Sequence, residues 1–157
     1  MVRDATPSAV LRLVGPGLGP TDRMAKWAED VGLQDGVTFV GVLNRREIAQ
    51  ELSQAWLLAH ASLEEACPMA VLEALGSRLP VVGGLRSGGV PYVLDHGRNG
   101  RLSDVQSAPA FARDILAVLS EGPDPSAVVR PPTQFQPTVV VAQYLRWYQS
   151  VLTGPRT

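Results

Sequence analysis

Short apolar runs alternate with segments of helical period along most of this chain, and this alternation constrains the fold more than any other feature. The runs have the length of strands and lie at 9–15, 37–41, 56–62, 80–84 and 100–102. Helical segments are expected at about 22–32, after Asn44, after Pro68, and at 89–95, 108–120 and 138–152. The third run, "WLLAHAS", is almost continuously apolar, which suits a parallel sheet covered on both faces. The sequence therefore predicts an α/β fold, a Rossmann-like doubly wound parallel sheet with right-handed crossovers.

The length of 157 residues suits one compact domain with a sizeable core, so we expect a single domain over 1–157. Its core is expected at about 8–121, followed by a proline-rich connection at 122–137 and a terminal helix at 138–152. That helix carries an apolar stripe with the spacing needed to pack on the core, made of Val141, Tyr144, Leu145, Tyr148 and Leu152, with Trp147 beside it.

Composition excludes several classes of partner. Fourteen basic and fifteen acidic residues give a net charge of -1, with no basic stripe for nucleic acid and no polybasic run for an anionic membrane. Cys67 is the single cysteine, so no internal disulfide can form, and a reducing compartment fits. The first residues lack a long apolar segment, so neither a signal peptide nor a transmembrane helix is expected and the predicted location is cytoplasmic.

Two glutamates eight residues apart frame the stretch "EACPMAVLE". Glu65 follows the third strand, at the edge of the sheet where ligands bind, and Glu73 lies in the second turn of the next helix. Helical side chains lean toward the N-terminus, so Glu73 can reach the same edge. Between them, first-turn N–H groups such as those of Met69 and Ala70 favour an anion such as phosphate. A carboxylate can accept two neighbouring ribose hydroxyls. The pattern predicts a nucleotide or sugar-phosphate site, with Glu73 on the ribose and Glu65 beside the rest of the ligand.

Simpler roles are compatible with the same two residues. Glu73 could be a solvated helix glutamate, and Glu65 an acid favoured by the helix dipole. Cys67 with His60 and His96 could suggest a cysteine hydrolase, but no local signature of that class surrounds the cysteine. Two distant histidines and one cysteine also do not make a set of metal ligands, so no metal site is predicted.

The glycines of "VGPGLGP" do not form a dinucleotide-binding fingerprint. They fall at 15, 17 and 19, whereas the fingerprint would place a glycine at position 20, where the chain has Pro20. A tight turn between strand and helix is still expected.

Several ordered motifs at matching separations resemble one known family. The stretch "EEACPMAVLEALGSRLPVVGGLRSGGVPYVLDHGRNGRL" is similar to the donor-binding signature of family-four retaining glycosyltransferases of the GT-B fold. Their pattern is Glu, seven residues and Glu-Ala, then Pro-Val-Val, Gly-Gly-x-Pro and a D-G-x-x-G turn, and Glu65 sets the register. The resemblance covers roughly 9–121, and more weakly the terminal helix. It implies that this chain is one half of a GT-B fold, the C-terminal half that binds a nucleotide-diphosphate sugar.

The resemblance also implies roles for single residues. Glu73 matches the glutamate that holds the ribose, and Glu65 matches the one near the transferred sugar that is implicated in the retaining chemistry. Ala66, Cys67 and Pro68, with the helix start at Met69 and Ala70, match the loop whose backbone faces the sugar and diphosphate. A further set matches segments that line the nucleotide pocket or approach the phosphates: Gly15, Val42, Leu43 and Arg45.

Three departures from the family pattern stand out. Tyr92 occupies the place of the glutamate in Gly-Gly-x-Pro-Glu. Arg78 replaces a glycine usual before Pro-Val-Val, so a left-handed backbone there would cost about 1 kcal/mol more than glycine. The family's Arg and Lys that neutralise the diphosphate lie upstream of the strand at 9–15, and the N-terminal acceptor domain is not expected within these residues either. Loss of two charged contacts would cost roughly 3 kcal/mol of donor binding.

We therefore expect the donor-binding domain of a retaining glycosyltransferase, with no essential metal or other cofactor, that would be inactive alone. The full enzyme would move a sugar from a nucleotide-diphosphate sugar to an acceptor hydroxyl. In the family the terminal helix crosses to the other domain, so here part of it is expected to be exposed or to mediate self-association. The alternative is a non-catalytic Rossmann-like module that binds a nucleotide or a protein. Base, sugar and acceptor stay open.

Overall fold

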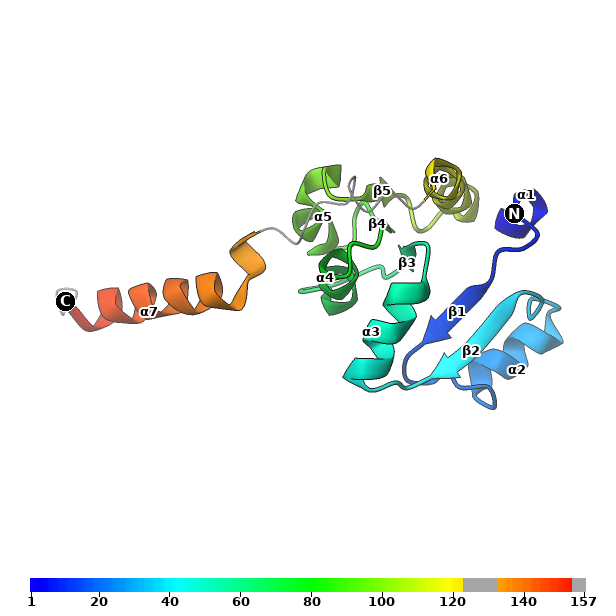
Figure 1. The fold of residues 1–157 in the computed structure, drawn as a ribbon, viewed down its shortest axis with the longest axis horizontal. Helices are drawn as coiled ribbons and strands as arrows, with labels where there is room; N and C mark the ends of the chain where they lie inside the picture. The colour runs from blue at the N-terminus through cyan, green and yellow to red at the C-terminus, as the bar shows by residue number, and fades with distance from the viewer. Residues whose placement is uncertain (123–132, 154–157) are drawn as a thin grey trace.

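A computed structural model of the protein describes residues 1–122 and 133–153 (Figure 1). The five predicted strands are present as β1 (Leu11–Val14), β2 (Val37–Gly41), β3 (Leu58–His60), β4 (Val81–Gly84) and β5 (Arg101–Ser103). The helices are α1 (Val2–Ala5), α2 (Arg23–Asp30), α3 (Arg45–Gln54), α4 (Met69–Gly76), α5 (Val90–Val93), α6 (Ala108–Glu121) and α7 (Pro137–Thr153), with short 3-10 turns η1 (Asp95–Gly97) and η2 (Thr133–Phe135). Most of the predicted connection at 122–137 lies outside the described residues, and α1 was not predicted.

All strand pairs are parallel, which confirms the predicted α/β class, but the strands form two sheets. β1 pairs with β2, and β4 lies between β3 and β5. Within the described residues, no backbone ladder joins β1 to β3, so each of these strands has one open edge. α3 links the two sheets along the chain and contacts α4 (Figure 1).

The core lies around β4, whose four residues are all buried. The inner face of α4, the short helix α5 and the turn after it pack against this strand, and partly buried side chains from β3, β5 and η2 extend the cluster. Its buried members are Val71, Ala74, Leu75, Leu79, Val81, Val90, Val93 and Leu94. This cluster fixes the position of α4, the helix on which the predicted site depends.

Two helices expose apolar side chains. On α2 only Ala28 is buried, whereas Trp27 is 50% exposed, because the two-stranded sheet beside this helix is narrow. On α7 the stripe does not pack on the core, because this helix extends away from both sheets (Figure 1), and the expectation that part of the helix is exposed is confirmed. Its exposed members are Val141, Tyr144, Leu145, Trp147, Tyr148, Val151 and Leu152. Self-association through this face stays a prediction.

Tyr92 occupies the position of the glutamate in the family pattern Gly-Gly-x-Pro-Glu, and its side chain makes a structural contact. The Tyr92 ring meets Phe135 edge to face, with ring centroids 5.5 Å apart. Phe135 in turn packs against the core cluster. The aromatic pair therefore fixes the short turn η2 that precedes α7.

None of the helices in the described part of the chain combines the length and apolar character needed to span a membrane.

Arg78 does adopt the left-handed conformation, with φ 57°. It follows the C-cap Ser77 of α4, and its N–H donates to the carbonyl of Leu75 while the N–H of Leu79 donates to that of Ala74. This pair of bonds is a Schellman motif, in which glycine is the usual residue at the left-handed position. The Arg78 side chain is exposed and has no recorded polar contact among the described residues, so nothing there offsets the backbone strain.

Replacing Arg78 by glycine is expected to raise the free energy of unfolding by about 1 kcal/mol, because the strain of a left-handed side-chain-bearing residue is removed. For a chain of this size the melting temperature would rise by about 2–4 °C. Thermal unfolding of the Arg78→Gly protein checks this, with Arg86→Gly in an exposed loop as the control. An unchanged or lower melting temperature for Arg78→Gly would contradict it.

Candidate functional site

The amino end of α4 carries the backbone groups expected to face an anion. Pro68 is buried and caps the helix, and its carbonyl accepts the N–H groups of both Val71 and Leu72. The N–H groups of Met69 and Ala70 have no backbone acceptor within the described residues, and both residues are exposed. The helix therefore presents two free donors and the positive end of its dipole to solvent.

The two glutamates lie on either side of this helix start in the sequence and are both partly buried. Glu73 belongs to the second turn of α4, and no hydrogen bond or ion pair to its side chain occurs among the described residues. Glu65 lies in the loop between β3 and α4. Its carboxylate oxygen Oε1 is 3.5 Å from Nε2 of His60, the last residue of β3. The site thus holds one free carboxylate and one that is already in contact with a side chain.

The loop after β4 holds the backbone of the loop that carries Glu65. The N–H of Gly89 donates to the Glu65 carbonyl at 2.6 Å, and the buried Ser87 hydroxyl donates to the carbonyl of Ser62. A Cβ on Gly88 would lie 2.3 Å from the Glu65 carbonyl oxygen, and one on Gly89 2.4 Å from that of Ala66. Only glycine allows this approach. The sequence motif Gly-Gly-x-Pro marks these positions, but this packing role was not predicted.

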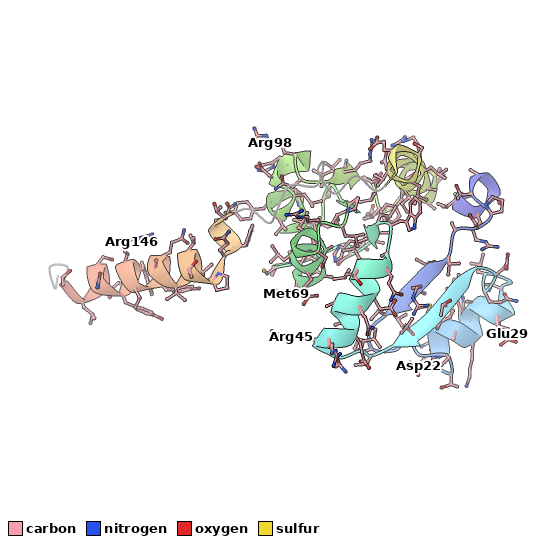
Figure 2. The ribbon with its side chains drawn as sticks, in the orientation of Figure 1. Asp22, Glu29, Arg45, Met69, Arg98 and Arg146 are labelled. Atoms are coloured by element: carbon pink, nitrogen blue, oxygen red, sulfur yellow. The ribbon has the colours of Figure 1, made fainter. Side chains whose placement is uncertain are left out.

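The residues predicted to line the nucleotide pocket or approach the phosphates lie at the two-stranded sheet of β1 and β2. Gly15 and the segment at Val42 and Leu43 follow the carboxyl ends of β1 and β2, where the N–H of Gly15 donates to the carbonyl of Gly41 at 2.8 Å. Arg45 begins α3 and is exposed; Asn44 caps this helix as predicted, in a capping box with Glu47. Figure 2 shows Arg45 and Met69 on the same side of the molecule. Within the described residues, no hydrogen bond or ion pair joins this set to the residues around α4.

Cys67, His60 and His96 were considered for a cysteine hydrolase or a metal site. Cys67 is exposed, and His60 contacts Glu65 instead of the cysteine. His96 lies in the turn after α5 with a left-handed backbone, φ 54°. In the part of the chain that the structure describes, no cluster of three His, Cys, Asp or Glu residues could hold a metal ion. The structure therefore gives the cysteine-hydrolase interpretation no support.

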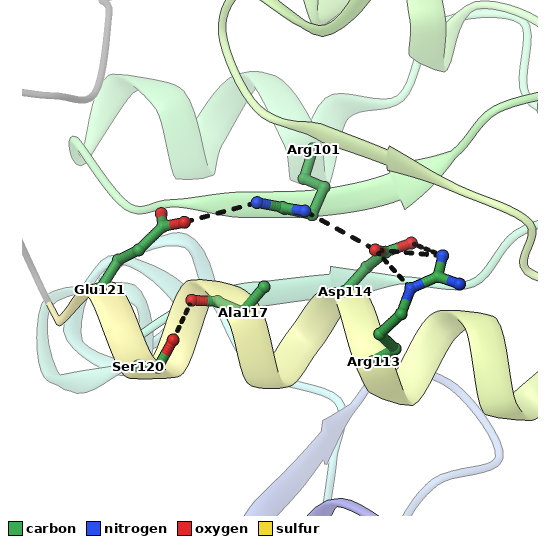
Figure 3. A network of polar contacts seen from close by, with 6 residues as sticks. All are labelled: Arg101, Arg113, Asp114, Ala117, Ser120 and Glu121. Atoms are coloured by element: carbon green, nitrogen blue, oxygen red, sulfur yellow. Dashed lines mark hydrogen bonds and ion pairs between the residues drawn. The ribbon is translucent and has the colours of Figure 1, made fainter.

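A polar network lies between β5 and α6, and it is structural in character (Figure 3). Asp114 is buried on α6, contacted by Arg113 and, at 3.7 Å, by Arg101 of β5. Arg101 also contacts Glu121 at 3.4 Å. Burial alone would raise the pKa of Asp114, but the hydrogen bonds from Arg113 and the charges of Arg113 and Arg101 together hold it below its usual value. Arg101 begins β5, so the network lies at the amino end of the strand, opposite the edge where Glu65 lies.

Comparison with known proteins identifies the family. The model of the family described as glycosyl transferases group 1 matches residues 1–130. The chain belongs to this family. It is 30% identical over 109 residues to D-inositol 3-phosphate glycosyltransferase of Mycobacterium sp. (strain KMS), a match that covers 69% of this chain and 25% of that protein. The chain thus spans about a quarter of the length of these curated relatives.

Solved glycosyltransferase structures share the fold. Sucrose-phosphate synthase from Thermosynechococcus elongatus superposes with a TM-score of 0.78 at 22% identity, over 98% of this chain and 41% of the other. The pneumococcal O-GlcNAc transferase GtfA, solved in complex with UDP and GlcNAc, superposes with a TM-score of 0.73 at 20% identity, over 97% of this chain and 31% of the other. The resemblance to one half of a GT-B glycosyltransferase is confirmed, as is the Rossmann-like fold.

Proposed function

We propose that this chain is the donor-binding half of a retaining glycosyltransferase that uses a nucleotide-diphosphate sugar. The observation that carries the proposal is the arrangement at α4, where an unpartnered carboxylate and two free backbone N–H groups occur within five residues of one helix start. Membership of the glycosyl transferases group 1 family and the likeness to a transferase solved with UDP support it.

In this proposal each part of the donor meets a group of matching chemistry. The diphosphate lies at the amino end of α4, where the N–H groups of Met69 and Ala70 and the helix dipole stabilise its charge. The carboxylate of Glu73 accepts hydrogen bonds from the two ribose hydroxyls. Glu65 lies beside the transferred sugar. Ala66, Cys67 and Pro68 contribute backbone to the same wall.

The remaining predicted residues and partners complete the proposal. Gly15, Val42, Leu43 and Arg45 would line the nucleotide pocket from the other sheet. Transfer is proposed to need no metal ion, because backbone donors and basic side chains neutralise the phosphates. The acceptor would be bound by a further domain of a longer enzyme, and 1–157 alone would bind the donor without transferring its sugar.

Replacing Glu73 by glutamine is expected to weaken nucleotide binding about tenfold, because the charged acceptor for the ribose hydroxyls is lost, at about 1.5 kcal/mol or more. Calorimetric titration of the chain with UDP, GDP, ADP and TDP checks this. Glu29→Gln is the matched control, since Glu29 is an exposed helix glutamate of α2 with no recorded partner among the described residues.

The outcomes separate the proposal from its alternative. Binding of one nucleotide that Glu73→Gln weakens and Glu29→Gln leaves intact supports the donor site and identifies the base. Nucleotide binding that both variants leave unchanged would favour a Rossmann-like module with a site elsewhere. Absence of binding at millimolar nucleotide, in this chain and in one extended upstream by the next strand, would contradict the proposal.

A further inference from the structure

Within the part of the chain that the structure describes, His60 is the one residue that forms an ion pair with the Glu65 carboxylate. It closes β3 and pairs with Gly83 of the central strand, so its backbone belongs to the sheet and does not move with the loop. Its side chain is 12% exposed and that of Glu65 is 32% exposed. The distance from Nε2 to Oε1 is 3.5 Å, within ion-pair range and longer than an ordinary N–H···O hydrogen bond.

The other ring nitrogen of His60 determines which tautomer this environment favours. Nδ1 is buried and has no hydrogen-bond partner among the described residues. In folded proteins a buried N–H without an acceptor is rarer than a buried acceptor with an unused lone pair. A neutral His60 is therefore best placed with its proton on Nε2, which is also the atom that faces the carboxylate acceptor.

The backbone of Glu65 is fixed independently of this contact. The Gly89 N–H holds the Glu65 carbonyl, and Ser87 holds the loop at Ser62. These contacts fix where the residue starts but leave its side-chain torsions free. A glutamate side chain loses rotamer entropy when it is ordered, so one orientation needs a partner at the carboxylate end.

We propose that His60 is a positioning residue, which holds the Glu65 carboxylate in one orientation through an Nε2–H donor. The proposal rests on the proposed function, in which Glu65 lies beside the transferred sugar. The imidazole touches neither the ribose nor the phosphates. It acts through the carboxylate and leaves the nucleotide contacts of Glu73 unchanged. Its loss should therefore remove the contribution of the sugar to binding and leave that of the nucleotide.

Two substitutions separate positioning from packing. His60→Leu keeps an apolar side chain of similar size in the strand but removes the donor. His60→Gln keeps an amide N–H near the position of Nε2. Because Nδ1 is a buried atom without a recorded partner, His60→Leu is expected to fold with a melting temperature equal to or above that of the parent. If the His60 side chain only filled space in the core, both variants would bind the nucleotide sugar with the same affinity.

NMR spectroscopy of the unliganded chain provides the first measurement. Long-range proton–nitrogen correlation should show His60 protonated on Nε2 at neutral pH. The two γ protons of Glu65 should have distinct shifts in the parent and in His60→Gln, and a single averaged shift in His60→Leu. Glu64, the exposed neighbour, is the internal control and should be averaged in all three proteins. A proton on Nδ1, or a Glu65 equally ordered in His60→Leu, would overturn the proposal.

The second measurement compares UDP, GDP, ADP and TDP with their glucose conjugates. For the nucleotide that binds, the ratio of the two dissociation constants should change at least threefold in His60→Leu and less than twofold in His60→Gln. The nucleotide alone should bind all three proteins equally. Equal ratios in all three would overturn the proposal. Absence of any nucleotide binding, in this chain and in one extended upstream by the next strand, would refute the proposed function instead, and the NMR result would still decide the role of His60.

Discussion

Replacing Gly89 by alanine is expected to lower the free energy of unfolding by about 3 kcal/mol. The added Cβ would lie 2.4 Å from the carbonyl oxygen of Ala66, a backbone atom that cannot move without the whole loop. The loop that carries Glu65 would shift, and the hydrogen bond from the Gly89 N–H to the Glu65 carbonyl would be lost or strained. Urea unfolding followed by circular dichroism measures the loss.

Gly76 gives the matched control for this substitution. It ends α4, has an ordinary helical backbone, and an added Cβ there would meet no atom within 4 Å. Gly76→Ala should therefore stabilise the chain by up to about 1 kcal/mol through helix propensity. A Gly89→Ala protein as stable as Gly76→Ala would show that the two loops do not pack as described. Reduced nucleotide affinity in Gly89→Ala is expected as well, since the same loop forms one wall of the proposed site.

The second large effect is expected at Asp114, where Asp114→Asn should cost about 2 kcal/mol at neutral pH. A buried carboxylate that accepts hydrogen bonds from cationic groups contributes more than a neutral pair. The amide cannot replace it, because Arg113 and Arg101 would then face a group without charge. Urea unfolding at pH 7 measures this loss. Asp30→Asn, at an exposed aspartate of α2 without a recorded partner among the described residues, should change the stability little.

The pH dependence of this effect follows from the direction of the pKa shift. In the folded chain the pKa of Asp114 lies below its usual value, so the ionised form is favoured by folding. The ionised Asp114 carboxylate stabilises the fold fully above the pKa that it has in the unfolded chain, about 3.9. This stabilisation is lost as the pH falls through the lower pKa of the folded chain. The difference in free energy of unfolding between the parent and Asp114→Asn should therefore be constant from pH 7 to pH 5 and should narrow below pH 4. A difference that widens on acidification would contradict the lowered pKa of Asp114.

The strands and most helices could be predicted because their signals are local. The apolar run predicted at 80–84 forms β4, whose residues Val81–Gly84 are all buried, and Asn44 with Glu47 forms the capping box that starts α3. The place of Arg78 before Pro-Val-Val in the family pattern raised the question of a left-handed backbone, which the structure has there. The prediction of which side chains are buried fails, because burial depends on partners far away in the chain. The stripe of the terminal helix has helical spacing, yet it is exposed, as is Trp27 on α2, since too little structure lies beside α2 and α7.

The site could be predicted in part for the same reason. Glu65, Glu73 and the start of α4 are close in sequence, so their spacing predicts a shared site, and that site stays a prediction. The contact between His60 and Glu65 was missed because a histidine in an apolar strand gives no sign of the direction in which its ring points. The close approach of Gly89 to Ala66 joins two loops, and only the Gly-Gly pair hinted at it. The division of the strands into two sheets left no signal in the separate runs.

Mapping a bound nucleotide onto individual backbone amides tests the central claim most directly. Proton–nitrogen correlation spectra would be recorded while UDP, GDP, ADP or TDP is added to the chain. If the diphosphate lies at the start of α4, the largest shifts should occur at the amides of Met69 and Ala70, and they should weaken with Glu73→Gln. Shifts confined to residues away from this helix start, unaffected by Glu73→Gln, would contradict the donor site proposed at α4.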